Sequence, residues 1–265
     1  SGRWLVTDSL RSARLWDLAD EVIKMNSRPL QLDEPIGFDL VRVSPDNRWL
    51  VTAGGKGTVE LRAFRNGGSL SSPIRLEGHG ASAKLLRISP DSRWLFSSTR
   101  LHHTFLWDLK SPAPASSSKA FAHERIVDAV FLPDSQMLVT SDAAGKAQLW
   151  RADDISNRAD SAVPVHVFAG HEGGICRVAM DPKGRWLATN RFEGELALWS
   201  LTPPYASESH KLGPMDTPVT FSTFSPDGHW LIAGCVNGTI KIWELSSFAD
   251  AAHAKPAVEL TGPEA

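Results

Sequence analysis

The stretch Phe224-Ser225-Pro226-Asp227-Gly228-His229-Trp230-Leu231-Ile232-Ala233-Gly234, followed closely by Asn-Gly-Thr-Ile-Lys-Ile-Trp-Glu-Leu at 237–245, decides the fold. Short β-prone runs alternate in it with Ser-Pro-Asp-Gly and Asn-Gly turn signals, which predicts strand, turn, strand, turn and strand. The same pattern occurs five more times in the chain, once without its beginning. A repeated supersecondary unit is therefore the basis of the architecture.

The repeat is visible as three columns of residues. The first turn recurs as Ser44-Pro45-Asp46, Ser89-Pro90-Asp91, Pro133-Asp134, Asp181-Pro182 and Ser225-Pro226-Asp227. The strand after it opens at Trp4, Trp49, Trp94, Met137, Trp186 and Trp230, and the third strand closes on Trp16, Arg62, Trp107, Trp150, Trp199 and Trp243. Corresponding positions in these two strand columns lie 43 to 49 residues apart, and all ten tryptophans of the chain fall in them. Such regularity indicates six copies of one structural unit.

A period of this length with short alternating strands is typical of a β-propeller built from four-stranded blades. The residues resemble the WD40-repeat family over essentially the whole chain. Gly78-His79 and Gly170-His171 match its Gly-His element, Trp16-Asp17 and Trp107-Asp108 match its Trp-Asp ending, and Trp243-Glu244 is a near match. The resemblance implies an all-β fold in a single domain.

We expect six blades, of which the first lacks its inner strand. Their approximate limits are 1–34, 35–78, 79–122, 123–170, 171–213 and 214–265. Because a ring without one inner strand has unpaired backbone groups along an open seam, we expect the chain to be a fragment of a longer one, with at least one further strand. A seven-bladed ring is one alternative. The blade-internal links at 111–119 and 153–162 are predicted to be a mobile Ser/Pro/Ala-rich loop and a polar loop, respectively.

Composition limits the classes of partner. The formal net charge is −2, so bulk electrostatics do not favour a nucleic acid or an anionic membrane surface. No stretch is apolar enough for a membrane span. Cys176 and Cys235 fall on expected strands of different blades, which favours small buried residues over a disulfide or a metal pair. We expect a reducing, cytoplasmic compartment.

Members of the resembled family carry a buried hydrogen-bonded set of His, Ser or Thr, Asp and Trp in one blade. In the fifth blade His171, Thr189 and Trp199 match three of these, while Glu193 occupies the expected acid slot. Buried polar groups of this kind satisfy one another and need no catalytic role. We therefore assign a structural role to His79, His171, Thr189, Trp16, Trp107, Trp150, Trp199 and Trp243. The Arg62 slot indicates either a loosely packed blade or an arginine paired with an acid.

The motifs that suggest chemistry have simpler interpretations. His102 and His103 are adjacent, so on a strand they point to opposite faces, and no acidic or cysteine ligand pattern accompanies them. Residues 54–58 (Gly-Gly-Lys-Gly-Thr) lack the spacing of a phosphate-binding loop and are read as a turn. Asn237-Gly238-Thr239 is formally a glycosylation sequon, but Asn-Gly is also a favoured hairpin turn. We expect no catalytic residue, metal or cofactor.

The resemblance implies a non-catalytic interaction module that docks a protein, a peptide or another domain of the same polypeptide. In the family, ligands usually bind the top face, where the second strands end. The candidate residues at this face are Lys56, Arg100, His102, His103, Asp142, Arg191, Phe192 and Asn237. The repeats look like bacterial WD40 arrays, which often stand beside a kinase, a protease or an NTPase domain. The alternatives are an accessory or sensor domain of such an enzyme, a propeller hydrolase with a site in its central channel, and a spacer.

Overall fold

The structure is a computed structural model of the chain. It describes residues 3–9, 12–18, 29–33, 38–54, 57–65, 69–99, 103–120, 125–158, 162–169, 171, 174–175, 177–191, 193–205, 208–213, 215, 217–246 and 256–261. The chain forms two compact units, one of residues 1–123 and 155–161 and the other of residues 124–154 and 162–265. Each unit is described by itself below.

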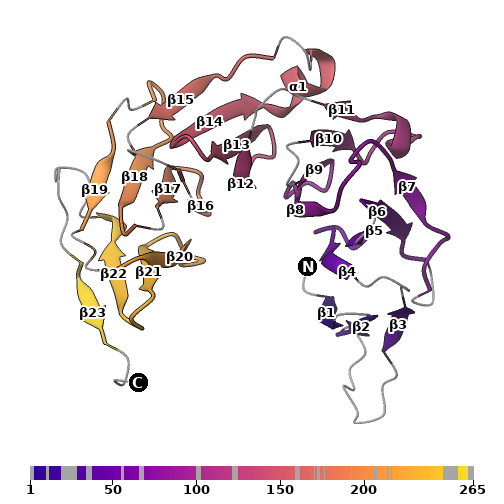
Figure 1. Cartoon of the computed structure of the whole chain (residues 1–265), viewed down its shortest axis with the longest axis horizontal. Coiled ribbons are helices and arrows are strands. Elements are labelled where there is room, and N and C mark those ends of the chain that lie inside the picture. The colour runs from indigo at the N-terminus through magenta and orange to yellow at the C-terminus, as the bar shows by residue number, and fades with distance from the viewer. Residues whose placement is uncertain are drawn as a thin grey trace. The chain divides into compact units, whose positions relative to one another are not determined.

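The first unit contains three antiparallel sheets (Figure 1). One has three strands, β1 (Trp4–Ser9), β2 (Ser12–Asp17) and β3 (Leu30–Asp33). The second has four strands, β4 (Phe38–Val43), β5 (Trp49–Gly54), β6 (Val59–Ala63) and β7 (Ile74–Leu76). The third also has four, β8 (Ala83–Ile88), β9 (Trp94–Thr99), β10 (Thr104–Asp108) and β11 (Lys119–Ala120).

The second unit contains three further four-stranded antiparallel sheets. The fourth blade is formed by β12 (Ile126–Phe131), β13 (Met137–Asp142), β14 (Lys146–Arg151) and β15 (His166–Ala169). The fifth is formed by β16 (Arg177–Met180), β17 (Trp186–Asn190), β18 (Leu196–Ser200) and β19 (His210–Leu212). The sixth is formed by β20 (Val219–Phe224), β21 (Trp230–Cys235), β22 (Ile240–Glu244) and β23 (Val258–Leu260). One three-stranded and five four-stranded sheets confirm the predicted all-β fold of the WD40 propeller class.

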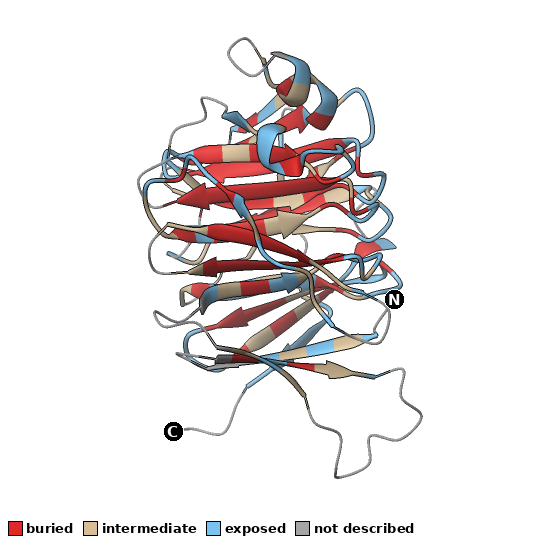
Figure 2. Cartoon of the chain, turned by 90° about the vertical axis from the view of Figure 1, so that its right-hand side faces the viewer, coloured by how far each residue is buried: buried red, intermediate tan, exposed pale blue. Residues whose placement is uncertain are grey.

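Hydrophobic clusters form between neighbouring sheets within each unit. In the first unit, Trp49 and Leu61 of the second blade pack with Leu95 and Trp107 of the third. In the second unit, the fourth and fifth blades share a cluster that includes Trp199, and the fifth and sixth share another that includes Trp243. Figure 2 shows the buried residues concentrated on the strands. The middle sheet of each unit is covered on both faces by its neighbours, so both of its faces must be apolar, and the buried tryptophans contribute the largest side chains to these layers.

The Ser-Pro-Asp sequence makes a turn held mainly by local hydrogen bonds. Ser44 Oγ lies 2.6 Å from Asp46 Oδ1 and accepts the Trp49 N–H at 2.9 Å, while Asp46 Oδ1 also accepts the Arg48 N–H. Asn47, between them, adopts a φ of 58°. The third and sixth blades repeat this arrangement. The motif thus fixes the first hairpin because it satisfies the turn's polar groups within six residues.

Two predicted links differ from expectation. The segment predicted as a polar loop contains the helix α1 (Ala152–Arg158), with two aspartates in its first turn and a buried Ile155. Acidic side chains at a helix N-terminus stabilise its dipole. The segment predicted as mobile contains a short 3₁₀ helix, Pro114–Ser116. Ser117 fixes that segment, because its Oγ accepts the Asp108 N–H at 2.9 Å and donates to the Pro114 carbonyl at 2.7 Å.

Candidate functional site

The second and third strands of most blades are joined by the same hydrogen bond, which is buried in the third, fourth and fifth blades. The indole Nε1–H of the third-strand tryptophan donates to a hydroxyl on the second strand. The pairs are Trp16 to Thr7 at 3.1 Å, Trp107 to Ser97 at 2.9 Å, Trp150 to Thr140 at 2.9 Å and Trp199 to Thr189 at 2.9 Å. The structural role predicted for these tryptophans therefore has a common geometric basis.

In the fifth blade a histidine extends this bond into a chain of four side chains. His171 Nε2 lies 2.6 Å from Thr189 Oγ1, and its Nδ1 lies 3.2 Å from Glu195 Oε2. When Nδ1–H donates to the carboxylate, Nε2 accepts a hydrogen bond from the Thr189 hydroxyl. The oxygen of that hydroxyl in turn accepts a hydrogen bond from the Trp199 indole N–H. Glu195, immediately before β18, is therefore the acid of the set. The sequence analysis wrongly placed it at Glu193, whose side chain is 75% exposed and pairs instead with Arg191.

Glu195 connects this buried chain to charges at the surface. Arg191 Nη1 lies 3.4 Å from Glu195 Oε2, and Lys211 Nζ lies 3.4 Å from Oε1. Burial alone would raise the pKa of Glu195, but its bonds to His171 and Lys211 outweigh burial and lower the pKa. Burial also lowers the pKa of His171, and Glu195 opposes that shift. The pair thus combines a buried imidazole with a carboxylate that stays ionised.

The third blade has the same hydrogen-bonded group of histidine, hydroxyl and tryptophan, here called the hub, without the acid. His79 Nε2 lies 2.8 Å from Ser97 Oγ, which also accepts the Trp107 indole. No acidic side chain faces His79 Nδ1 within the described part of the chain. Burial lowers the pKa of His79 to about 4, opposed by the Leu76 carbonyl. His79 is therefore a neutral imidazole at physiological pH.

The remaining blades show what replaces the hub. In the second blade Arg62 donates to Thr52 Oγ1 at 3.1 Å and pairs with Glu60 at 2.7 Å. The predicted alternative of an arginine paired with an acid is confirmed. In the sixth blade Ala233 stands ten residues before Trp243, where the second to fifth blades have a hydroxyl. The sixth blade therefore has no hydroxyl at this position to face the Trp243 indole.

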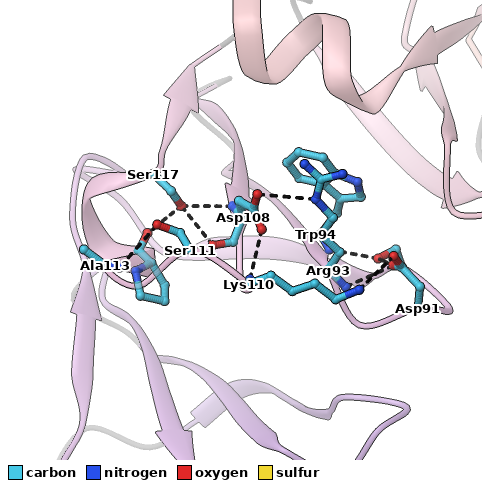
Figure 3. Close-up of polar contacts among 10 residues, drawn as sticks. Asp91, Arg93, Trp94, Asp108, Lys110, Ser111, Ala113 and Ser117 are labelled. Atoms are coloured by element: carbon cyan, nitrogen blue, oxygen red, sulfur yellow. Dashed lines mark hydrogen bonds and ion pairs between the residues drawn. The ribbon is translucent and has the colours of Figure 1, made fainter.

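The aspartate of the Trp-Asp ending binds the arginine that precedes the second strand. Arg93 Nε lies 3.3 Å from Asp108 Oδ2, and the Arg93 guanidinium lies over the Trp94 ring (Figure 3). Lys110 reaches back to Asp91 at 3.4 Å. Burial alone would raise the pKa of Asp91, but the bonds from Ser89, Arg93 and Lys110 lower it. In the first blade Arg3 and Asp17 form the equivalent pair at 2.8 Å. These charges stabilise the end of the sheet opposite the predicted docking face.

Four of the predicted docking residues are described. His103 Nδ1 contacts the His79 carbonyl at 2.7 Å, and Asn237 Oδ1 accepts the Thr239 N–H in the predicted turn. Asp142 is buried, and its Oδ1 accepts the Ala144 and Lys146 N–H groups, so its carboxylate holds the turn. Arg191 is the cation between Glu193 and Glu195. The other four, Lys56, Arg100, His102 and Phe192, lie outside the described residues.

A hollow of about 490 Å³ lies beside Arg191 in the fifth blade. It is lined by both charged and apolar side chains, including Glu193, Lys211, Leu212 and Met215. Within the described part of the chain no group of His, Cys, Asp and Glu residues is arranged to hold a metal ion. Cys235 is a buried free thiol. The described residues around this hollow are a mixture of charged and apolar groups.

Comparison with known proteins identifies the repeats. The family model described as "WD domain, G-beta repeat" matches residues 162–200 and 207–244. Each matched segment begins before the outer strand of one blade and ends with the third strand of the next, so one sequence repeat spans two sheets. Because neighbouring blades share a repeat, each depends on the other for stability.

Three curated relatives are animal or fungal proteins. "Protein LST8 homolog" of Drosophila melanogaster is 29% identical over 58% of this chain and 49% of its own length. "Telomerase Cajal body protein 1" of Mesocricetus auratus is 27% identical over 54% and 26%, respectively. "Target of rapamycin complex subunit wat1" of Schizosaccharomyces pombe is 28% identical over 43% and 33%. The chain thus spans half or less of the length of these relatives.

These results leave some sequence predictions as they were. The bacterial type of array and the cytoplasmic location stay predictions, as do the blade limits. No helix among the described residues has the length and apolar character needed to cross a bilayer. The family model thus identifies WD40 repeats at residues 162–200 and 207–244, and the sheets and tryptophan columns extend the same repeat pattern along the described part of the chain.

Proposed function

We propose that the chain is a non-catalytic docking module for a protein or peptide. The docking surface is the end of the sheets at which second strands finish and third strands begin. It includes the predicted residues Arg191 and Asn237. The experiments below use the second unit, in which the described residues show this end in three successive blades.

The exposure of apolar side chains at this end carries the proposal. Val236, next to Asn237, is 58% exposed, and Val127 and Phe221 are 42% and 45% exposed. All three belong to the starts of first strands or the ends of second strands in the fourth and sixth blades. Apolar groups gathered on one end of a soluble module, rimmed by polar side chains, mark interaction sites.

The charged groups of the fifth blade also support docking rather than chemistry. His171 and Glu195, whose pKa values are displaced, are bonded to each other and to Thr189 within the blade. One relative is by its printed name a subunit of a target of rapamycin complex. Assembly with other proteins is the function that these observations favour. An accessory role in a larger enzyme and a hydrolase site in a channel stay unsupported alternatives.

A matched pair of Val→Asp variants tests the proposal. Val236→Asp places a charge on the proposed surface, whereas Val163→Asp does so at a 75% exposed residue beyond the opposite end of the fourth blade's outer strand. Each purified full chain is cross-linked in extract, and the recovered proteins are quantified. We expect one or more proteins to be recovered with the wild type and Val163→Asp and to be lost with Val236→Asp. Equal recovery with both variants would contradict the proposal.

A further inference from the structure

The innermost strands of the second unit carry a constellation of side chains that the sequence analysis did not single out. β12 lies beside β16, and β16 lies beside β20 (Figure 1). Along these strands the exposed residues Val127, Arg177 and Phe221 each stand near the start of their strand. An arginine is thus placed on the strand between two exposed apolar side chains.

Hydrogen bonds between the blades fix how these three strands lie beside one another. Asp128 Oδ2 accepts the Val178 N–H at 3.2 Å, which brings Arg177 beside the segment that contains Val127 and Asp128. On the other side, Asn190 is the register partner of Arg177. Its side chain donates to the Val219 carbonyl at 3.4 Å and accepts from Ser222 Oγ at 3.1 Å, on both sides of Phe221.

Arg177 has no acidic partner among the described residues. Among the described residues, neither Arg177 nor the exposed Arg125, directly before β12, forms an ion pair or a side-chain hydrogen bond. Asp128, the carboxylate nearest in the register, is buried and bonds to backbone N–H groups. By contrast, Arg191 in the same blade is paired with two glutamates. Within the described part of the chain, the constellation therefore presents positive charge without a paired acid.

The exposed ring of Phe221 packs against a defined part of the adjacent strand. The Phe221 ring lies over Gly234 on the adjacent strand, where an added Cβ would stand 2.0 Å from Cε1 of the ring. A glycine at this position lets the ring lie against the β21 backbone. The ring is thus pre-positioned on the strand next to that of Arg177, so that binding of a partner costs less conformational entropy.

The first unit has different side chains at the corresponding positions of its innermost strands. There the bulged residue of β4, Asp39, pairs with its equivalent on β8, Lys84, at 3.5 Å and also accepts from Ser82. Leu85, in the register position of Phe221, is 8% exposed. In the first unit, therefore, the charged side chains pair with each other and the apolar side chain is buried. In the second unit Arg177, Val127 and Phe221 are exposed.

We propose that Arg177, Val127 and Phe221 bind a partner segment in which an acidic side chain is flanked on both sides by apolar residues. Arg177, with Arg125 nearby, receives the carboxylate, and the Val127 and Phe221 side chains contact the flanking residues. Arginine and aromatic side chains are enriched among the residues that dominate interface energies. This inference rests on the proposed docking function and names the chemistry of its partner.

Three labelled nine-residue peptides test it against the full chain by fluorescence anisotropy. The first has a central Leu-Glu-Phe in a Gly/Ser background, the second replaces Glu by Lys, and the third replaces Leu and Phe by Ser. We expect measurable binding of the first only. Arg177→Glu should weaken that binding at least tenfold, because the variant places a carboxylate opposite the carboxylate of the peptide.

Two further variants separate binding from folding. Gly234→Ala displaces the Phe221 ring without removing it and should weaken binding severalfold. Lys183→Glu, an exposed turn residue at the other end of the same blade, is the charge-matched control and should bind as the wild type. Thermal melts of all three variants should show one transition near that of the wild type.

The outcomes separate this inference from the docking function. Equal binding by the wild type and Arg177→Glu, or preference for the Lys peptide, would overturn the inference. So would binding of a single-stranded oligonucleotide in place of the acidic peptide. If no peptide binds while Val236→Asp still abolishes partner recovery, docking stands and the acidic-apolar partner is wrong. If the peptide binds through Arg177 while Val236→Asp has no effect, the broader surface is wrong and the inference stands.

Discussion

The third and fifth blades contain the same buried hub and differ chiefly in whether an acid accompanies the histidine. Both join a tryptophan indole, a second-strand hydroxyl and a histidine, with Ser97 in one and Thr189 in the other. Only the fifth has a carboxylate, Glu195, against the second ring nitrogen. The hub therefore does not require the acid to form, since its geometry is set by the indole, hydroxyl and imidazole alone.

The acid changes the electrostatics of the fifth blade rather than its packing. Burial lowers the pKa of both histidines, to about 4 for His79, while Glu195 opposes the shift for His171. Glu195 also pairs with Lys211, so the buried hub of the fifth blade is linked to surface charge. The hub of the third blade is neutral and has no acidic partner among the described residues. The hub of the fifth blade is coupled to surface charge through Glu195.

The largest effect should follow removal of either tryptophan. Trp107 and Trp199 are 0% and 1% exposed, so Trp107→Ala and Trp199→Ala should each cost about 3–5 kcal/mol of unfolding free energy. Urea unfolding followed by far-ultraviolet circular dichroism measures both. A difference between the two variants of more than about 2 kcal/mol would mean that the two tryptophans do not contribute equally to the free energy of unfolding.

Acidification should reveal the neutral histidine of the third blade. Its pKa of about 4 lies below the ordinary value of 6.5, so between these pH values the unfolded chain binds a proton that the folded chain does not. The stabilisation is fully present above pH 6.5 and is lost as the pH falls towards 4, by up to about 3 kcal/mol. Urea unfolding at pH 7, 5.5 and 4.5 should show a shallower dependence for His79→Gln. Parallel profiles for wild type and variant would show that His79 does not titrate in this window.

Loss of the hydroxyl should affect both blades to an intermediate extent. Ser97→Ala and Thr189→Val each leave an indole N–H and a histidine nitrogen without their buried partner, which should cost about 1–3 kcal/mol. Thr140→Val removes the acceptor of the Trp150 indole and gives the comparison in the fourth blade. A cost below about 0.5 kcal/mol for Ser97→Ala and Thr189→Val would show that the hydroxyl does not hold the indole and the imidazole in place.

The smallest effect should come from making the fifth blade resemble the third. Glu195→Gln keeps a group near His171 Nδ1 but removes its charge, so the pKa of His171 should fall further and stability at pH 7 should drop by about 1 kcal/mol. Glu193→Gln, at an exposed side chain, should change stability by less than about 0.5 kcal/mol. Titration of the His171 ring by nuclear magnetic resonance measures the first effect. An unchanged pKa would mean that the carboxylate does not act on the ring.

The fold could be predicted from the sequence because its determinants are local and repeated. The Ser-Pro-Asp turns close their own hydrogen bonds, and the tryptophans recur in two columns, so each hairpin is specified within a few residues. The helix α1 was not predicted, because its short acidic start looks like a polar link unless the burial of Ile155 is known.

The site was harder to predict because it depends on contacts between strands and blades. Glu195 rather than Glu193 meets His171, and a two-residue difference cannot be resolved by aligning slots in repeats of unequal turn length. Arg177 and Phe221 attract no attention as single residues, since nothing in their own repeats shows how their strands lie beside one another. Arg62 was the exception, because an arginine in an otherwise tryptophan column calls for an acid, and Glu60 is two residues away.

The buried indole-to-hydroxyl bonds also provide a spectroscopic probe in each of three blades. Trp107, Trp150 and Trp199 each place one exchangeable N–H on a buried hydroxyl, in three different blades. Such a proton exchanges with solvent only when its blade opens, and indole N–H resonances are resolved from the backbone amides. The chain thereby carries natural probes of whether the blades open one at a time or together, with no added label.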